Sequence, residues 1–355
     1  MIDSAYLFAD GVELAPDSIA AGAAVVRAGG LIGLPTETVY GLGADASDPT
    51  AVGKIFTAKG RPADHPLIVH VAAFDGGMGG VAHYCARVPA FAQQLMSAFW
   101  PGPLTLILPR REGVGEATAG GQNSIGLRCP AHPVAQALLA ALRKPAEGES
   151  EVWGIAAPSA NKFGRVSPTT AAHVHSEFGD DLLILDGGPC EVGIESTIID
   201  CTRGAPVLLR PGSITAAQVA DACGRQLLSK EELEAHSQQG PRASGTLESH
   251  YAPSATVRLM DAKALQAALD LLASAQAPED ARPTIALYHR SPLHMRSPLV
   301  IAHRMPSHAA PAAHELFSKL REMDAQGVKL IWVETPPDAL EWDGVRDRLT
   351  RAAAG

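Results

Sequence analysis

Short apolar runs alternate with amphipathic stretches through the first 225 residues of the chain. Continuous apolar runs of four to eight residues are typical of buried strands, whereas the longer stretches with helical periodicity predict helices between them. The predicted helices begin at Asp17 and at Asp48-Pro49 and lie near 88–98, 132–143 and 168–178, the last capped by Ser167-Pro168; the predicted strands are 31–35, 66–71, 104–108, 124–128, 154–157, 181–186, 196–200 and 206–210.

A polar segment interrupts this pattern at 229–255, and a second alternation of strands and helices begins at residue 256. The segment contains glycine and proline but no long apolar run, which is typical of a linker. We therefore predict an α/β fold with a domain at 1–228 built on a twisted mixed sheet, a linker at 229–255, and a smaller Rossmann-like α/β domain at 256–355. In this last domain the predicted strands are 256–260, 283–288, 298–303 and 328–334, and the predicted helices are 261–274, 311–326 and 343–353.

The composition favours loops and disfavours nucleic-acid binding. Glycine and proline contribute 34 and 27 residues, which predicts an active site built on loops. The net charge is −9, and residues 1–225 carry 15 basic and 22 acidic side chains, so 15 − 22 = −7 falls in this part. Binding to a phosphate backbone needs clustered Lys and Arg, so RNA binding is kept only as a weak alternative.

The cysteines and the apolar runs bear on location. The five cysteines form no C-x-x-C pair, which favours a reduced, cytoplasmic protein without a zinc site. No H-E-x-x-H motif is present, so we expect no metal site built by the protein alone. The N-terminal segment has no basic region followed by an apolar one, and no apolar run reaches the roughly 18 residues of a membrane span. We expect neither export nor contact with a membrane.

The densest group of candidate residues is GLPTETVYGLGAD (33–45), where Thr36, Glu37, Thr38 and Tyr40 follow a predicted strand between glycines. Hydroxyl and backbone groups in such a loop can approach a ligand closely, although a plain glycine-rich turn is the alternative.

Two cations, Lys59 and Arg61, stand at the predicted end of a helix just before Pro62. They suit the negative end of the helix dipole, so a solvated capping pair is one interpretation. A rigid loop that presents an ammonium beside a guanidinium also fits a clamp for a polyphosphate. His65 and His70 flank the next strand; structural histidines are the ordinary interpretation, and the neighbouring cations favour binding.

Ser124 and Arg128 are four residues apart in one predicted strand and therefore face the same side. We expect their hydroxyl and guanidinium to converge on one anion. The segment GMGGVA (77–82) matches a dinucleotide fingerprint only in part and is interpreted as a flexible loop. No P-loop motif occurs in the chain.

Polar residues gather again in APSANKFGRVSPT (157–169), where Ser159, Asn161 and Ser167 precede a predicted helix. A helix N-terminus favours anionic ligands, and ordinary capping is the alternative interpretation. GIESTIID (193–200) and LLRPGSIT (208–215) add Ser196 and Arg210.

Several of these motifs together resemble a known family. PTETVYGLG, AKGRP, PLIVHV, PSANKFGRVSPT, ESTIID and LLRPGSI follow one another over about 200 residues, in the order of the YrdC-type domain of threonylcarbamoyl-AMP synthases. The linker sequence SHYAP and the domain after it are similar to the long, two-domain form of that family. The resemblance implies that L-threonine, bicarbonate and ATP react to L-threonylcarbamoyladenylate and pyrophosphate. A separate transferase would then use the product to make N6-threonylcarbamoyladenosine in tRNA.

The same resemblance implies roles for individual residues. Lys59 and Arg61 would be catalytic, as part of the family's K-x-R element, and Asn161 belongs to its S-x-N element. Threonine would be held by Thr38, His70, Arg128, the backbone of Ala157, and Ser196. ATP would be held by Arg61, His65, Ser124, Ser159, Asn161, Ser167, Arg210 and, from the linker, Tyr251.

The implied reaction needs no side-chain nucleophile, and no Ser-His-Asp or Cys-His arrangement is visible. We expect catalysis by positioning and charge stabilisation, with Mg²⁺ bound together with ATP. Residues around 240–253, with Tyr251 turned inward, are expected to form a lid over ATP. A carbamoyltransferase of hydrogenase maturation shares the domain type, but the C-x-x-C zinc fingers and the acylphosphatase-like segment that accompany it are absent from this sequence.

Overall fold

The computed structural model describes residues 16–73, 76, 78–145, 147–228, 240–245, 250–274 and 282–355. The N-terminal segment 1–15 and most of the predicted linker, 229–239 and 246–249, lie outside the described residues. The chain divides into two units, Met1–Phe163 with Ser167–Thr246, and Gly164–Val166 with Leu247–Gly355. The division falls inside the predicted linker, and each unit has its own sheet.

The N-terminal unit is built on a nine-stranded sheet in the order β7-β1-β2-β6-β3-β5-β4-β8-β9. Parallel pairs such as β3 with β5 alternate with antiparallel pairs such as β4 with β5, so the predicted mixed sheet is confirmed. The strands are β1 Ile32–Leu34, β2 Gly41–Asp45, β3 Ile68–His70, β4 Leu104–Pro109, β5 Ser124–Arg128, β6 Ile155–Ala156, β7 Leu183–Ile184, β8 Thr197–Asp200 and β9 Val207–Arg210.

Helices cover one face of this sheet along most of its width. Val69, Leu106 and Leu127 point into a large hydrophobic core together with apolar side chains of helices α2, α3, α4 and α7. Alternate strand residues point to opposite faces, so their sequence neighbours must be accommodated on the other side. These helices are α2 Pro49–Lys59, α3 Met78–Tyr84, α4 Ala90–Phe99 and α7 Ala216–Cys223.

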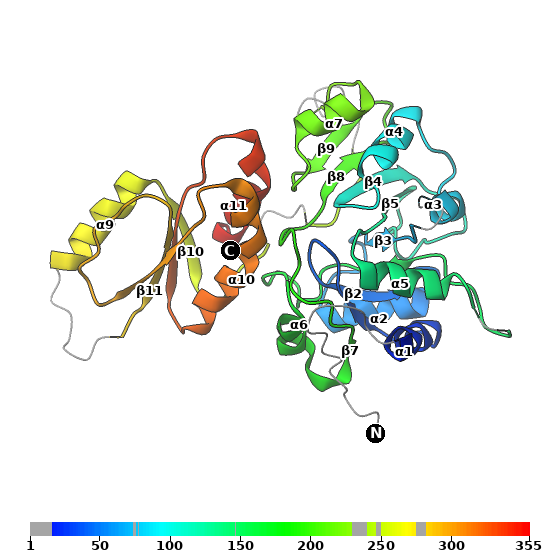
Figure 1. Ribbon diagram of the computed structural model, residues 1–355, viewed down its shortest axis with the longest axis horizontal. Coiled ribbons are helices and arrows are strands. Elements are labelled where there is room, and N and C mark those ends of the chain that lie inside the picture. The colour runs from blue at the N-terminus through cyan, green and yellow to red at the C-terminus, as the bar shows by residue number, and fades with distance from the viewer. Residues whose placement is uncertain are drawn as a thin grey trace. The chain divides into compact units, whose positions relative to one another are not determined.

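The opposite face is covered on one half only. Helices α1 Pro16–Arg27 and α5 Pro133–Leu142 lie side by side (Figure 1) and pack over Ile32 and Ile155. On the half from β3 to β9, the described residues form only a small cluster of Ile68, Ile107 and Ile198. We call this half the open face.

The structure corrects the predicted elements at several points. The glycine-rich 41–45 stretch is strand β2, where Gly43 leaves no room for a side chain because Ile155 Cγ2 would lie 2.8 Å from a Cβ. Residues from Met78 onward form helix α3 instead of a flexible loop, and α7 was not predicted. Helix α6 Ala171–Phe178 begins three residues later than expected, because Thr170 is its N-cap.

The C-terminal unit contains a sheet of four parallel strands in the order β10-β13-β11-β12. Figure 1 shows α9 on one face of this sheet and α10 and α11 on the other, which is the predicted Rossmann-like arrangement. Leu265 and Leu269 of α9 pack against Leu287. The elements are β10 Thr256–Met260, α9 Ala262–Ser274, β11 Ile285–His289, β12 Val300–Arg304, α10 Ala309–Ala325, β13 Leu330–Glu334 and α11 Asp343–Ala353.

Candidate active site

A row of polar side chains crosses the open face of the nine-stranded sheet. In the strand register His70 lies opposite Arg128, Arg128 opposite Thr105, Thr105 opposite Ile198, and Ile198 opposite Arg210. Residues that are partners in neighbouring strands share a face, so these side chains stand next to one another. All four polar members are buried. Polar residues in such positions need partners, and the contacts of this row define the candidate site.

Arg128 is the centre of the row. Its Nη2 lies 2.7 Å from Oε1 of Glu37, its Nη1 donates to Thr38 Oγ1 at 2.7 Å, and its Nε donates to the carbonyl of Gly102 at 3.3 Å. Glu37 and Thr38 come from the loop between β1 and β2. A guanidinium carries more N–H groups than these partners occupy. The site therefore presents a buried cation whose remaining donors can hold a carboxylate.

Ser196 connects the row to Arg210. Thr105 and Ser196 share a hydrogen bond between their hydroxyls at 2.7 Å, and Arg210 Nη2 donates to the Ser196 carbonyl at 2.9 Å and to its hydroxyl at 3.2 Å. Arg210 Nη1 donates to the carbonyl of Ser244 at 2.9 Å. Both sequence-predicted residues, Ser196 and Arg210, thus meet at one point of the open face.

The end of helix α2 brings Lys59 and Arg61 to the same face. Gly60 ends the helix with φ of 66°, a left-handed conformation that glycine adopts without strain, and so turns the chain between the two cations. Arg61 Nη2 donates to the Pro66 carbonyl at 3.0 Å and to the Ser244 hydroxyl at 3.4 Å. Through Ser244, Arg61 is therefore joined to Arg210.

Lys59 joins the K-x-R element to the S-x-N element. Its Nζ donates to the carbonyl of Ser159 at 2.5 Å and to the carbonyl of Asn161. Burial lowers the pKa of this ammonium well below its ordinary value, and the nearby Arg61 guanidinium lowers it further. Lys59 thus braces the loop of Ser159 with two of its three N–H donors, and its expected role at the phosphates stays a prediction.

His70 is placed to contact a ligand without adding charge. Burial, followed by the neighbouring Arg128, lowers the pKa of His70 to about 3, so the imidazole is neutral near pH 7. Its buried Nδ1 has no hydrogen-bond partner among the described residues. Ala157, on the neighbouring segment, donates its N–H to the Ile68 carbonyl at 3.0 Å, which fixes its backbone beside β3.

The predicted convergence of Ser124 and Arg128 on one anion stays a prediction, and the geometry of β5 limits the ligand that could satisfy it. They stand on the same face of β5 but at its two ends, which are about 13 Å apart for a rise of ~3.3 Å per residue. Ser124 lines a narrow pocket with Ile68, Gly126 and Ser244, away from Glu37 and Thr38. The two side chains can share only a ligand long enough to span the strand.

Three other predicted residues have their own surroundings. His65 is half-buried with its ring centre 5.8 Å from that of Phe163, and burial followed by Arg61 lowers its pKa. Ser167 does not cap α6, because its hydroxyl donates to Glu195 at 2.5 Å. Tyr251 belongs to the C-terminal unit, where it is fully buried with φ of 63° and its ring centre 5.3 Å from that of Phe317. The ATP contacts of these residues stay predictions.

One described part of the predicted linker lies on the open face. Arg242 pairs with Asp64 at 2.8 Å, and its N–H donates to Gln122 at 2.7 Å. Ala243 packs against the Ile68 cluster, and Ser244 reaches Arg61 and Arg210 as described above. Residues 240–245 therefore cover part of the polar row, whereas the lid expected over 240–253 stays a prediction.

Sequence inspection missed four residues of this network. Glu37 was visible in the PTETVYG segment but received no role, and Thr105 lies in an apolar strand that carries no motif. Glu195 stands in the ESTIID motif beside Ser196, and only its burial and its bond to Ser167 reveal it. Ser244 lies in a linker without any pattern. Only the strand register and the fold bring them together.

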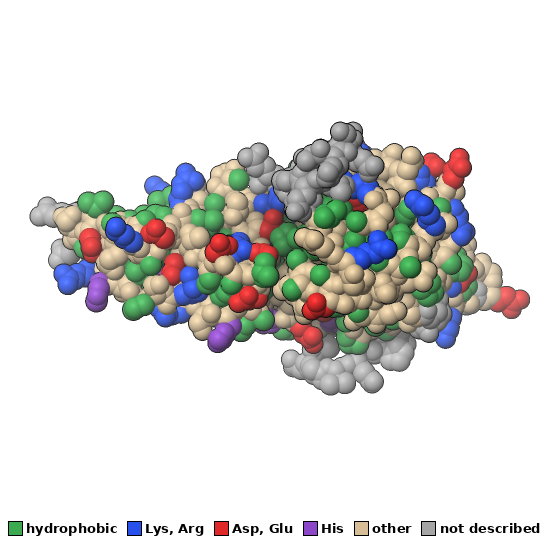
Figure 2. Space-filling model, turned by 90° about the horizontal axis from the view of Figure 1, so that it is seen from above, with side chains coloured by type: hydrophobic (Ala, Val, Ile, Leu, Met, Phe, Trp, Pro, Cys, Tyr) green, Lys and Arg blue, Asp and Glu red, His purple; other side chains and the backbone are tan. Residues whose placement is uncertain are grey.

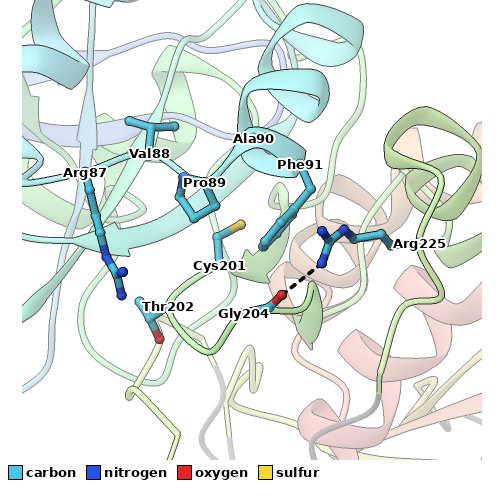
Figure 3. A pocket seen from close by; sticks show the side chains of 9 residues that line it. All are labelled: Arg87, Val88, Pro89, Ala90, Phe91, Cys201, Thr202, Gly204 and Arg225. Atoms are coloured by element: carbon cyan, nitrogen blue, oxygen red, sulfur yellow. Dashed lines mark hydrogen bonds between the residues drawn. The ribbon is translucent and has the colours of Figure 1, made fainter.

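A separate cavity of about 250 Å³ lies beyond the other end of β8 (Figure 3). In the close-up, Arg225 stands beside Phe91 and donates to the Gly204 carbonyl at 3.0 Å, while Arg87 reaches in from the opposite side. None of the sequence-predicted site residues lines this cavity. Cys201 lines it and follows β8, whereas Ser196 precedes that strand, so the cavity is distinct from the polar row.

The row offers two places for anions, one at Arg128 with Thr38 and one at Arg61 with Arg210. Among the described residues, no group of three or more His, Cys, Asp or Glu side chains is arranged to hold a metal ion. No described helix is both long and apolar enough to cross a membrane.

Comparison with known proteins identifies the family of this chain. A family model described as "Telomere recombination", which joins the Sua5, YciO and YrdC proteins, matches residues 24–212, and one described as "Threonylcarbamoyl-AMP synthase, C-terminal domain" matches residues 214–354. The threonylcarbamoyl-AMP synthase of Bacillus subtilis is 35% identical over 339 residues, which are 95% of this chain and 93% of the relative. The Pyrococcus abyssi enzyme of that name is 43% identical over 244 residues, 68% of this chain and 67% of the relative.

A solved structure extends the match to the whole fold. The crystal structure of P. abyssi Sua5 complexed with L-threonine has a TM-score of 0.81 and 35% sequence identity, and the match covers 96% of each chain. The second family model, the Bacillus subtilis relative and the solved structure all include the second domain. The chain therefore belongs to the threonylcarbamoyl-AMP synthase family, in its two-domain form.

Proposed function

We propose that this chain converts L-threonine, bicarbonate and ATP into L-threonylcarbamoyladenylate and pyrophosphate. The observation that carries the proposal is the buried row on the open face, which joins a carboxylate-binding end at Arg128 to a phosphate-binding end at Arg61 and Arg210. The relative solved with L-threonine matches this chain over both domains, which supports threonine as the amino acid substrate.

At the Arg128 end, the α-carboxylate of threonine would take the donors that Glu37, Thr38 and Gly102 leave available. The neutral His70 and the Ala157 carbonyl then face the rest of the amino acid. The neutral amine forms a bond to the carbon of bicarbonate and becomes an N-carboxylate, while the C–OH bond breaks and the hydroxide leaves with the amine proton as water. An oxygen of that carboxylate attacks the α-phosphate, and pyrophosphate leaves.

At the other end, Arg61 and Arg210 would stabilise the charge that develops on the phosphates, while Lys59 holds the Ser159 loop against them. ATP enters with Mg²⁺ as one substrate. Phosphates and water supply most ligands of such an ion. The chemistry needs positioning and charge, with no covalent intermediate on the protein.

The decisive experiment measures pyrophosphate release with ATP, Mg²⁺ and bicarbonate. We expect release that depends on L-threonine and on bicarbonate, with little release when glycine replaces threonine. A product that carries both the AMP and the threonine mass should accumulate in step with pyrophosphate. Release that is equal with and without amino acid would identify a nucleotide hydrolase instead.

We further propose that a transferase consumes the product, moving its threonylcarbamoyl group to an adenosine of tRNA. An acyl adenylate is an activated, water-labile compound, so a second enzyme must use it soon after release. On the face seen in Figure 2, Lys and Arg side chains are scattered and form no large patch, which supports the small-molecule role over RNA binding. All five cysteines are free and buried, in keeping with the cytoplasmic location we propose.

A further inference from the structure

The carboxylate of Glu37 is held rigidly inside the candidate site. Glu37 is only 5% exposed, and its backbone carbonyl accepts the Val192 N–H at 2.7 Å. The same loop is tied by Thr36, whose hydroxyl bonds to the Thr38 hydroxyl at 2.9 Å. The position of the Glu37 side chain is therefore fixed from both sides, by the loop behind it and by Arg128 in front of it.

The carboxylate of Glu37 is paired by charge but accepts no hydrogen bond. Oε1 forms an ion pair with Arg128 Nη2 at 2.7 Å, and neither Oε1 nor the buried Oε2 has a hydrogen-bond partner among the described residues. A buried carboxylate oxygen without a donor costs stability, and folded proteins rarely leave one unless something else supplies the donor. A substrate group that donates a hydrogen bond would supply the donor that this carboxylate lacks.

We propose that Glu37 Oε2 accepts a hydrogen bond from the side-chain hydroxyl of L-threonine and so determines the amino acid specificity of the site. This inference rests on the proposed function. Arg128 is paired with Glu37, so an amino acid whose α-carboxylate binds Arg128 has its nearest donor groups, the amine and the hydroxyl, beside Oε2.

Chemistry selects the hydroxyl over the amine. The amine must lose a proton before it takes up carbon dioxide, and an anionic carboxylate beside it would stabilise the protonated form. A hydroxyl on the same oxygen stays neutral and leaves the amine available to react. A site built to bond a substrate hydroxyl also rejects analogues without it, because its buried acceptor then remains unpaired.

The test compares two substrates on one enzyme preparation. L-2-Aminobutyrate has the carbon skeleton of threonine without the hydroxyl, and kcat/KM for pyrophosphate release is measured with each amino acid. In the natural protein we expect a strong preference for threonine. In Glu37→Gln we expect this preference to fall by about 10–100-fold, since a hydrogen bond to a charged group contributes on that order. The preference is the ratio of kcat/KM with threonine to kcat/KM with L-2-aminobutyrate, and this ratio does not depend on how much of the variant is folded.

Each result then has one meaning. If both substrates lose the same factor and the ratio stays that of the natural protein, Glu37 is structural or contacts the amine, and the proposed role is overturned. Glu191→Gln is the matched control and should keep the natural ratio, because Glu191 is an exposed carboxylate that directly precedes Val192, the residue bonded to the Glu37 carbonyl. If the glutamine variant does not fold, Glu37→Asp is the second variant. It keeps the negative charge but is one methylene shorter, so its carboxylate lies farther from the threonine hydroxyl and the ratio should again fall.

The outcome also separates this inference from the proposed function. A natural protein that releases no threonine-dependent pyrophosphate contradicts the proposed function itself. Threonine-dependent release in the natural protein together with an unchanged ratio in Glu37→Gln contradicts only the role of Glu37.

Discussion

Two buried carboxylates, one in each unit, stand beside an arginine and yet are completed in different ways. Glu334, the last residue of β13, accepts the N–H groups of Arg290 and Ser291 at 2.7 Å each and the Ser291 hydroxyl at 2.7 Å, and Arg290 Nη2 lies 3.1 Å away. Glu37 has its ion pair with Arg128 and an oxygen without a donor among the described residues.

The difference distinguishes a polar group that serves the fold from one that serves a ligand. At Glu334, burial alone would raise the pKa, but the hydrogen bonds from Ser291 and Arg290 and the Arg290 charge outweigh it and hold the pKa below its ordinary value. That network closes the turn after β11 and needs nothing else. Among the described residues, Glu37 Oε2 and His70 Nδ1 in the row have no hydrogen-bond partner, and a bound substrate can supply one.

Arg61→Ala should have the largest effect and should act on rate. We expect threonine-dependent pyrophosphate release to fall by about 10²–10³, the loss typical of removing one group that stabilises developing charge. The unfolding midpoint should change little, because removing Arg61 also removes its repulsion of the Lys59 ammonium. Single-turnover kinetics and thermal unfolding measure the two effects.

Arg296→Ala is the control for Arg61, because Arg296 is an exposed arginine of the C-terminal unit. Its rate should equal that of the natural protein. Unchanged pyrophosphate release in Arg61→Ala would remove this residue from the phosphate-binding end of the row.

Glu334→Ala should act on stability. The substitution removes the acceptor of four contacts and leaves the Arg290 charge beside the sheet, so we expect a loss of about 2–3 kcal/mol in the free energy of unfolding of the C-terminal unit. Hydrogen exchange of the β11 and β13 amides reads out that unit. Unchanged exchange rates there would mean that Glu334 does not stabilise the turn. Glu334 could then no longer be contrasted with Glu37 as a carboxylate that stabilises the fold.

The sequence predicts much of the fold because most elements carry their own pattern. The parallel strands of the C-terminal unit are continuous apolar runs, and Asp48-Pro49 marks the start of α2 as observed. Strand β2 is hidden because Gly41 and Gly43 occupy places where side chains of neighbouring strands leave no space. These glycines are needed because the sheet is closely packed at β2. In the sequence alone, a glycine-rich stretch is typical of a turn, so the strand is not predicted.

The candidate site is less predictable because it depends on strand order. Arg128 meets Thr105 and His70 only because β5 lies between β4 and β3, and no local pattern fixes that order. Motifs shared with a known family name residues such as Thr38 and Ser196, but they do not reveal contacts with a strand that carries no motif. Ser124 and Arg128 have different surroundings because they stand at the two ends of β5.

The last prediction uses pH to compare His70 with Glu334. The pKa of His70 is about 3 in the folded protein against ~6.5 in an unfolded chain, so between these values the unfolded state binds a proton that the folded state does not. Its stabilising contribution is therefore complete above pH ~6.5 and is lost as the pH falls, at up to about 1.4 kcal/mol per pH unit.

Glu334 has a lowered pKa, so its contribution is present above the ordinary glutamate value and is lost only as the pH falls below ~4.3. Between pH 6.5 and 5, histidines therefore dominate the loss, and His65, His83 and His132 contribute because their pKa values are lowered as well. Urea unfolding of the natural protein and of His70→Gln at pH 6.5, 5.75 and 5 isolates His70 as the difference in slope. Equal slopes would show that His70 is protonated in the folded protein, and the row would then carry an additional positive charge beside Arg128.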